Sequence, residues 1–233
     1  MNIASMIDHA ALHPSLTDDQ LRAECLVALQ NGTASICIKP YAVKLAASVL
    51  AGSAVKVCTV VGFPHGSTSI DAKWAEAMAA IENGATEIDA VVNTGKANSL
   101  DWHYMTEEIA AITELCHSKG ALVKFIFENT FLASDAIKIK LCEICTAAGA
   151  DFVKTSTGFD YVKLADGNFG TLGAQDNDIR LMRANIAPQM QVKASGGIRT
   201  LADVERLFAL GATRFGTSST IQILAQAALK ESK

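Results

Sequence analysis

The chain has 233 residues, of which half are hydrophobic and 19% are charged. This composition excludes an intrinsically disordered protein and fits a single domain over residues 1–233. The 20 Lys and Arg residues against 24 Asp and Glu residues give a net charge of −4. We therefore expect no diffuse basic surface for nucleic acid, and any anion-binding site must be local. No apolar run approaches the roughly 18 residues of a membrane span, so we expect no membrane association.

Cysteine usage points to a reducing compartment. Residues 1–12 have no basic start and no long apolar run, so we expect no targeting segment and a cytoplasmic protein with reduced thiols. Cys142 and Cys145 form a C-x-x-C pair inside the apolar-periodic run 137–148. Because no second Cys/His pair stands at metal spacing, a buried helix face is favoured over a zinc or redox site.

Short β-branched runs alternate with longer Ala-rich amphipathic runs along the chain. The predicted strands are, in chain order, Met6–Ala10, Ser35–Ile38, Val55–Gly62, Glu87–Asn93, Leu122–Asn129, Phe152–Thr155, Val192–Ser195 and Arg214–Ser218. Several are nearly continuous apolar runs, as in parallel sheets that are covered on both faces. The predicted helices, read with their start and stop signals, are Leu21–Leu29 (Thr17 and Gln20 to Gly32), Ser69–Glu82, Asp101–Ser118, Ser134–Ala148 and one from Thr200 and Asp203 to Gly211.

Eight strand–helix units of about 29 residues predict a (β/α)8 TIM barrel, because a βα repeat takes about 30 residues. An open doubly wound sheet is the main alternative. That fold would carry a dinucleotide fingerprint near its first strand, and the chain has neither G-x-G-x-x-G nor a Walker A motif. The barrel is therefore favoured.

Charged residues stand inside four successive predicted strands. They are Asp89, Lys124, Lys154 and Lys193. A single strand lysine usually marks a strand end that reaches solvent, and Lys56 fits that interpretation. Three lysines and an acid at similar depth indicate a shared pocket at the carboxyl ends of the strands.

Paired lysines have a specific chemical use. A second ammonium about 4 Å away, at an effective dielectric constant of about 20, destabilises a charged lysine by about 4 kcal/mol, or roughly three pKa units. Lys154 and Lys193 lie on successive strands, so one cation could bring the other amine near neutrality and make it a Schiff-base nucleophile. Asp89 would then move protons.

Two small-residue loops follow the last two predicted strands. The first runs from Ser195 to Thr200 through Gly196 and Gly197, and the second runs from Gly216 to Thr220. Each leads into a helix, whose free N–H groups suit phosphate, and this is the usual phosphate site of a barrel. We expect phosphate to bind there.

With these motifs in place, the sequence resembles the deoxyribose-phosphate aldolases along essentially its whole length. The specific segments are Ile7–His9, Val61–Pro64, Phe152–Gly158, Val192–Arg199 and Gly216–Ser219. The resemblance implies a metal-free, cofactor-free class I aldolase in deoxyribonucleoside catabolism, with a sugar phosphate and acetaldehyde as ligands and a homodimer or tetramer as the assembly. It implies Lys154 as the Schiff-base residue, Lys193 as the tuning lysine and Asp89 as the proton-transfer acid. It also implies a phosphate site at Gly158, Gly196, Gly197, Gly216, Ser218 and Ser219, and pocket positions at Asp8, Cys37 and Lys124.

The chain departs from the family pattern at three places. Ala10 replaces a usual hydroxyl residue, Glu128-Asn129-Thr130 replaces Glu-Thr, and Phe159–Gln175 forms a loop about ten residues longer than usual. Long loops are often lids or recognition loops, although a passive surface insertion is an equal alternative. The departures leave open a related aldolase with a different acceptor or donor. A non-catalytic sugar-phosphate-binding barrel is the third hypothesis, which the joint presence of Asp89, Lys154 and Lys193 disfavours.

Overall fold

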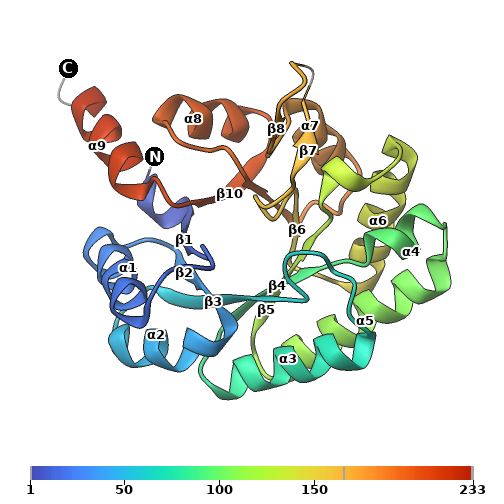
Figure 1. The fold of residues 1–233 in the computed structure, drawn as a ribbon, viewed down its shortest axis with the longest axis horizontal. Helices are drawn as coiled ribbons and strands as arrows, with labels where there is room; N and C mark the ends of the chain where they lie inside the picture. Colours follow the sequence, from blue (N-terminus) through green and yellow to red (C-terminus); the bar gives the residue numbers. More distant parts are fainter. Residues whose placement is uncertain (1, 165, 232–233) are drawn as a thin grey trace.

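A computed structural model describes residues 2–164 and 166–231. Parallel strands close into an eight-stranded barrel in the order β1-β10-β9-β6-β5-β4-β3-β2, and helices surround it (Figure 1). The barrel strands are β1 (Ile7–Ala11), β2 (Ser35–Ile38), β3 (Lys56–Val61), β4 (Glu87–Val91), β5 (Leu122–Ile126), β6 (Phe152–Lys154), β9 (Gln191–Ser195) and β10 (Ala212–Thr217). The predicted TIM barrel is confirmed.

The helices lie outside the barrel, and several of them begin after a residue whose side chain caps the first turn, namely Thr17, Ser69, Asn93, Asp101 and Thr200. The helices are α1 (Asp18–Asn31), α2 (Val43–Val49), α3 (Ile70–Glu82), α4 (Thr94–Asn98), α5 (Trp102–Ser118), α6 (Asp135–Ala148), α7 (Asp176–Ala184), α8 (Leu201–Ala209) and α9 (Thr220–Glu231), with short 3-10 turns η1 (Ala4–Met6), η2 (Pro40–Ala42) and η3 (Asn129–Phe131). Thr17 and Thr200 both form complete capping boxes, with Gln20 and Asp203 respectively. The helix starts that the sequence predicted there are confirmed.

Two barrel strands end earlier than predicted, close to a residue with left-handed backbone. The strand expected over Leu122–Asn129 ends at Ile126, and Glu128 has a φ of 52°. The strand expected over Val55–Gly62 ends at Val61, where Gly62 follows with a φ of 63°. A positive φ interrupts the extended backbone, so both strands are shorter than the apolar pattern alone indicates.

The long segment Phe159–Gln175 contains a small antiparallel hairpin of β7 (Val162–Lys163) and β8 (Phe169–Gly170). It stands beside the barrel between β6 and α7 (Figure 1). The sequence predicted an unusually long loop here. It did not predict the two strands within it, which are only two residues long.

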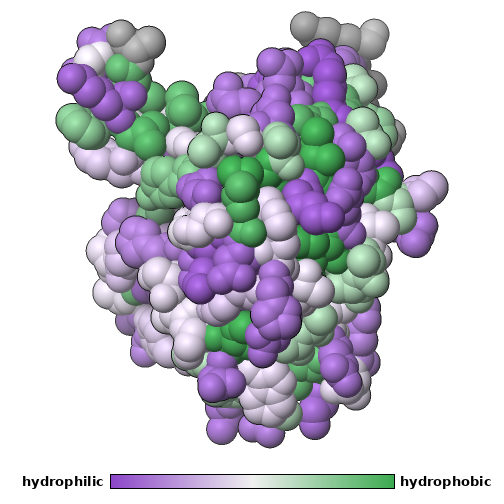
Figure 2. All heavy atoms as spheres, turned by 90° about the vertical axis from the view of Figure 1, so that its right-hand side faces the viewer, coloured by the Kyte–Doolittle hydropathy of each residue, from purple (hydrophilic) through white to green (hydrophobic). Residues whose placement is uncertain are grey.

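A continuous apolar core fills the space between the barrel and its helices. Cys142 and Cys145 belong to that core on the buried face of α6, and their thiols are free. The outer helical face in Figure 2 is mainly hydrophilic, with apolar residues scattered between. In the described residues, no helix combines the length and apolar character needed to cross a membrane.

Candidate active site

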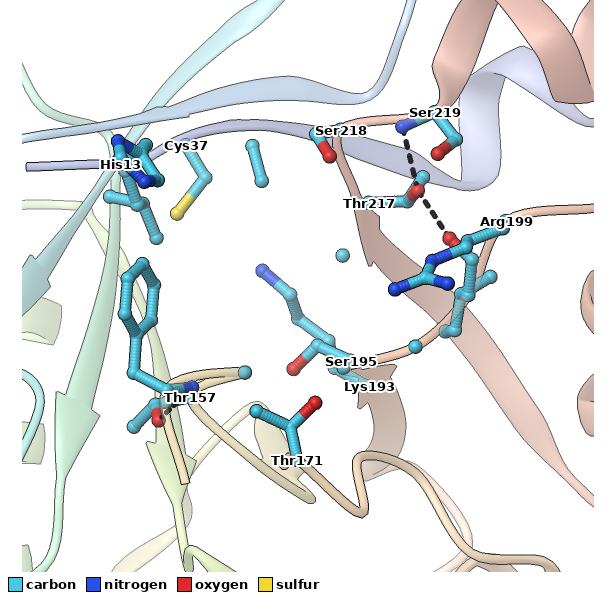
Figure 3. A pocket seen from close by; sticks show the side chains of 18 of the residues that line it. His13, Cys37, Thr157, Thr171, Lys193, Ser195, Arg199, Thr217, Ser218 and Ser219 are labelled. Carbon is cyan, nitrogen blue, oxygen red and sulfur yellow. Dashed lines mark hydrogen bonds between the residues drawn. The ribbon is translucent and has the colours of Figure 1, made fainter. Parts of the chain in front are cut away.

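A cavity of about 380 Å³ opens at the carboxyl ends of the barrel strands. Figure 3 shows its centre, where the Lys193 side chain points into the space between the loops. The predicted residues on its wall are Cys37, Lys154, Gly158, Lys193, Gly196, Gly197, Gly216, Ser218 and Ser219. Nine residues that the sequence singled out thus line one cavity, although they come from strands and loops far apart in the chain.

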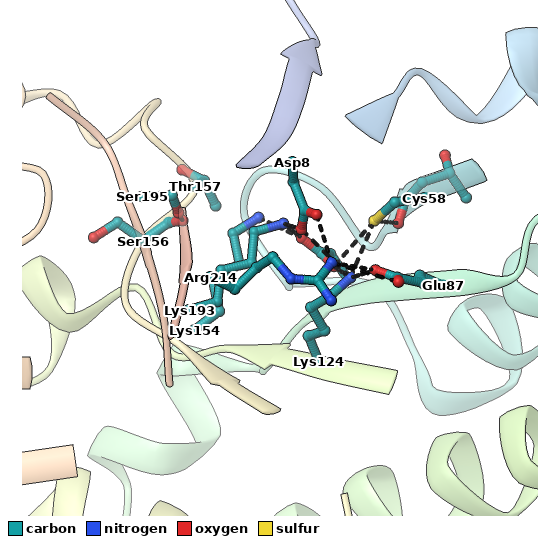
Figure 4. A network of polar contacts seen from close by, with 12 residues as sticks. Asp8, Cys58, Glu87, Lys124, Lys154, Ser156, Thr157, Lys193, Ser195 and Arg214 are labelled. Carbon is teal, nitrogen blue, oxygen red and sulfur yellow. Dashed lines mark hydrogen bonds and ion pairs between the residues drawn. The ribbon is translucent and has the colours of Figure 1, made fainter. Parts of the chain in front are cut away.

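Asp89 lies directly beneath this cavity and binds three lysines. Its Oδ2 atom is 2.7 Å from Lys154 Nζ and 2.7 Å from Lys193 Nζ, and its Oδ1 atom is 2.8 Å from Lys124 Nζ. Cys58 Sγ also donates to Oδ1 at 3.2 Å. All four charged side chains are almost fully buried, so this is one compact ion cluster (Figure 4).

Strand register produces the cluster. Asp89 on β4 is in register with Lys124 on β5, and Lys154 on β6 is in register with Lys193 on β9. Neighbouring parallel strands lie about 4.8 Å apart, so in-register side chains on the inner face meet. The expected proximity of Lys154 and Lys193 is thereby confirmed.

A lower layer of charges supports the cluster from inside the barrel. Arg214 on β10 is 2.6 Å from Asp8 and 3.1 Å from Glu87, and Lys124 is 2.6 Å from Glu87. Lys193 also donates to Asp8. Asp8 and Lys124, which the family resemblance placed among the pocket residues, lie in this layer and not on the cavity wall, because their strands bring them in deeper.

The cluster fixes the protonation of its carboxylates. Burial opposes ionisation of Asp89, but the charges of Lys124, Lys154 and Lys193 outweigh it and hold the pKa of Asp89 well below its usual range. Burial likewise opposes the charge of Lys193, yet Asp8 and Asp89 raise the pKa of Lys193 above its usual value. The sequence led us to expect simple repulsion between two ammoniums. The structure corrects this, since a shared carboxylate oxygen lies next to both.

The two glycine loops form the other end of the cavity. Gly196 and Gly197 have φ angles of 90° and 75°, which Cβ-bearing residues rarely adopt. Thr217 Oγ1 donates to the Ile198 carbonyl oxygen at 2.7 Å and accepts from Ser219 N–H at 2.9 Å, which ties the two loops together (Figure 3). The loops precede the amino ends of α8 and α9, where backbone N–H groups and the helix dipole favour an anion.

Several residues of this site were not predicted. Arg199 adds a guanidinium to the wall at the glycine loops, and Thr171 adds a hydroxyl from the long loop. Glu87, Arg214 and Cys58 belong to the ion cluster. The sequence contained a signal that could have identified Glu87 and Arg214. Glu87 is two positions before Asp89, and Arg214 two before Gly216, so each shares a strand face with a predicted site residue.

Two groups of cluster residues have the spacing of metal ligands, namely Cys37, Cys58 and Asp89, and Asp8, Cys58 and Glu87. Every carboxylate in them already accepts from a lysine or an arginine. A metal ion would have to compete with these fixed positive charges, so the carboxylates fit the lysine and arginine side chains better than a metal ion.

Comparison with known proteins places the chain among aldolases. The model of the DeoC/LacD aldolase family matches residues 3–221. The deoxyribose-phosphate aldolase of Rhodopirellula baltica is 45% identical over 97% of this chain and 89% of its own length. The deoxyribose-phosphate aldolase of Clostridium perfringens is 44% identical over 95% of this chain and 93% of its own. The tetrameric deoxyribose phosphate aldolase structure from Aeropyrum pernix superposes with a TM-score of 0.85, at 32% identity, covering 97% of this chain and 91% of that one.

Proposed function

Because the chain belongs to the DeoC/LacD family of aldolases, we propose that it works through a Schiff base on Lys154. The reaction is that of a deoxyribose-phosphate aldolase, which reversibly cleaves 2-deoxy-D-ribose 5-phosphate to D-glyceraldehyde 3-phosphate and acetaldehyde. Relatives of that name align with nearly the full chain at 44–45% identity. One observation supports the choice of lysine most directly: Lys154 lies on the cavity wall and binds only one carboxylate of the ion cluster.

The charge balance of the cluster explains why Lys154 is the nucleophile. The carboxylates of Asp8, Glu87 and Asp89 face four cations, so one positive charge is in excess. Lys124 contacts three of these carboxylates, and Lys193 and Arg214 contact two each. A neutral Lys154 leaves the cluster balanced, and a neutral amine is the nucleophilic form.

The chemistry then follows from the neutral amine. Lys154 Nζ adds to the substrate aldehyde carbon, and loss of water gives an iminium ion. Removal of the proton from the C3 hydroxyl breaks the C2–C3 bond, releases glyceraldehyde 3-phosphate and leaves the electron pair as an enamine. Protonation of the enamine carbon and hydrolysis release acetaldehyde and restore Lys154.

Asp89 lies where it can transfer protons beside the Schiff base. In the resting site its oxygens accept from Lys154, Lys193 and Lys124, which keeps the carboxylate ionised. The iminium nitrogen takes the place of the Lys154 amine, so the substrate carbons that gain and lose protons lie beside this carboxylate. We therefore assign proton transfer to Asp89, with Lys193 keeping one donor on the same oxygen throughout.

The phosphate group fits the opposite end of the cavity. Backbone N–H groups around Gly196, Gly197 and Gly216, the hydroxyls of Ser218 and Ser219, and the Arg199 guanidinium supply donors there. Gly158 approaches Gly196 closely and completes this wall. A mildly acidic protein can thus bind an anionic substrate through local donors.

A turnover assay tests the function. Wild-type protein should release glyceraldehyde 3-phosphate from 2-deoxy-D-ribose 5-phosphate, and Lys154→Met should lose turnover while retaining its fold. Lys140→Met on the surface of α6 is the matched control, because Lys140 forms a partly exposed ion pair with Glu143, away from the ion cluster. Full turnover by Lys154→Met would refute the assignment.

Assembly and location are part of the proposal. We propose a homo-oligomer, a dimer or a tetramer, supported by the tetrameric relative from Aeropyrum pernix; light scattering on the purified protein would measure it. The six free, buried cysteines support a reducing cytoplasmic location, which cell fractionation would test.

A further inference from the structure

The hairpin segment 159–175 reaches the active-site cavity with both of its legs. Phe159 on the first leg and Thr171 on the second leg both lie on the cavity wall. Phe159 packs edge-to-face against Phe63, with ring centroids 5.3 Å apart. The segment therefore forms part of the cavity, which argues against a passive surface insertion.

Asp160 holds the two legs together. Its side chain is fully buried, and its Oδ2 atom accepts from the Thr130 hydroxyl and from the Leu172 N–H, each at 2.9 Å. Thr130 belongs to η3 after β5, and Leu172 follows Thr171 directly. One carboxylate thus connects the barrel, the first leg and the second leg.

Backbone contacts fix the second leg against the phosphate-site loop. Gly173 has a φ of 62°, and a Cβ atom there would lie 2.4 Å from the Gly196 carbonyl oxygen. Ala174 N–H donates to the same oxygen at 3.1 Å. Gly196 also lies next to Gly158, so three segments meet here, and neither Gly173 nor Gly196 has room for a side chain. Thr171 is therefore held two residues from a rigid junction.

Thr171 is an exposed residue of the cavity wall whose hydroxyl is available to a ligand, whereas two other hydroxyls of that wall are already engaged. Ser195 Oγ donates to the Ser156 carbonyl oxygen at 2.6 Å, and Thr157 Oγ1 donates to Glu128. No hydrogen bond joins the Thr171 hydroxyl to any residue that the structure describes. Figure 3 shows Thr171 across the cavity from Ser218 and Ser219, so it lies away from the serines of the phosphate site.

We propose that Thr171 recognises the hydroxyl group of the acceptor aldehyde, and that Asp160 is the positioning residue that holds Thr171 in place. The inference rests on the proposed function and adds a specificity determinant to it. Ala10, also on the cavity wall, has no polar side-chain atom to offer. The inserted hairpin brings a hydroxyl into the same cavity.

Two acceptors that differ only in the hydroxyl test the proposal in the synthetic direction with acetaldehyde. They are D-glyceraldehyde 3-phosphate and 3-oxopropyl phosphate, which both carry the phosphate. Thr171→Val should lower kcat/KM for the first about five- to tenfold, the range of one lost hydrogen bond, and leave the second unchanged. Thr171→Ser should retain the preference. Lys163→Ala, on the exposed outer part of the hairpin, is the control and should change neither.

The positioning role of Asp160 has its own measurement. Asp160→Ala should reduce the discrimination between the two acceptors, and adding it to Thr171→Val should cause no further loss of discrimination. Equal losses for both acceptors in Thr171→Val, or no loss for either, would overturn the assignment of Thr171. Additive losses in the double variant would overturn that of Asp160. Trapping of acetaldehyde on Lys154 needs no acceptor, so its absence in the wild type would instead refute the proposed function.

Discussion

Lys154 and Lys193 donate to the same oxygen of Asp89, each from 2.7 Å. Their amines therefore lie no more than twice that distance apart. They come from in-register positions on β6 and β9, which the sequence separates by the whole hairpin and α7. The proposed Schiff-base lysine and the proposed tuning lysine are thus coupled through a carboxylate as well as by direct repulsion.

Lys193→Met should slow Schiff-base formation on Lys154. Without the Lys193 ammonium, the three carboxylates of the cluster hold the Lys154 amine more tightly, and an amine held as a cation is not a nucleophile. A charge about 5 Å away at an effective dielectric constant of about 20 contributes ~3 kcal/mol, so acetaldehyde trapping by borohydride should be roughly a hundredfold slower than in the wild type. An unchanged trapping rate would show that the two amines do not interact.

Arg214→Met should destabilise the fold by about 3 kcal/mol, because two buried carboxylates each lose a direct ionic partner. Asp8 and Glu87 are almost fully buried and both contact this guanidinium. Urea unfolding measures the loss. Lys140→Met serves for comparison, since its exposed pair with Glu143 contributes less than about 1 kcal/mol. Equal effects of the two variants would contradict the supporting role of Arg214.

Glu128 should make stability depend on pH near neutrality. Burial, opposed by hydrogen bonds from Thr157, raises the pKa of Glu128 from 4.5 to about 7. A raised pKa means that the folded state holds the proton more tightly, so stability is full below pH 4.5 and falls as pH rises to 7. Over that interval the wild type should lose roughly 3 kcal/mol relative to Glu128→Gln. Urea unfolding at several pH values measures the difference, and parallel curves for the two proteins would count against it.

Gly196→Ala and Gly197→Ala separate steric exclusion from backbone strain. Both positions have positive φ, so each substitution should cost about 1–2 kcal/mol. At Gly196 the new Cβ would also lie 2.7 Å from the Gly173 Cα, whereas at Gly197 it would meet no atom within 4 Å. Gly196→Ala should therefore be less stable and show a higher KM for the phosphorylated substrate. If Gly197→Ala were the more damaging variant, the packed glycine junction would not matter.

Local signals in the sequence predicted most of the fold. The capping boxes of Thr17 and Thr200 depend on residues three apart, and the β-branched runs depend on short stretches, so both can be read without tertiary information. The short helices α2 and α4 and the two-residue strands β7 and β8 were not predicted, and no range was predicted for the nine-residue helix α7. Elements this short have little periodicity and are stabilised by their contacts with the rest of the molecule.

The candidate site was predictable where a charged residue stands in a strand whose other residues are apolar and expected to be buried. Lysines in apolar strands are unusual, which singled out Lys124, Lys154 and Lys193. The sequence could not tell how deep each would lie, because depth depends on the stagger between strands of the closed barrel. For that reason Lys124 and Asp8 were expected on the cavity wall although they lie beneath it, and Arg214 was overlooked.

Borohydride trapping tests the central claim most directly. The protein would be incubated with acetaldehyde, reduced with sodium borohydride, digested and mapped by mass spectrometry. We predict an ethyl group on Lys154 and none on Lys193 or Lys124, whose ammoniums are each held by at least two carboxylates. An unmodified Lys154, or a label found on Lys193 in its place, would contradict the account.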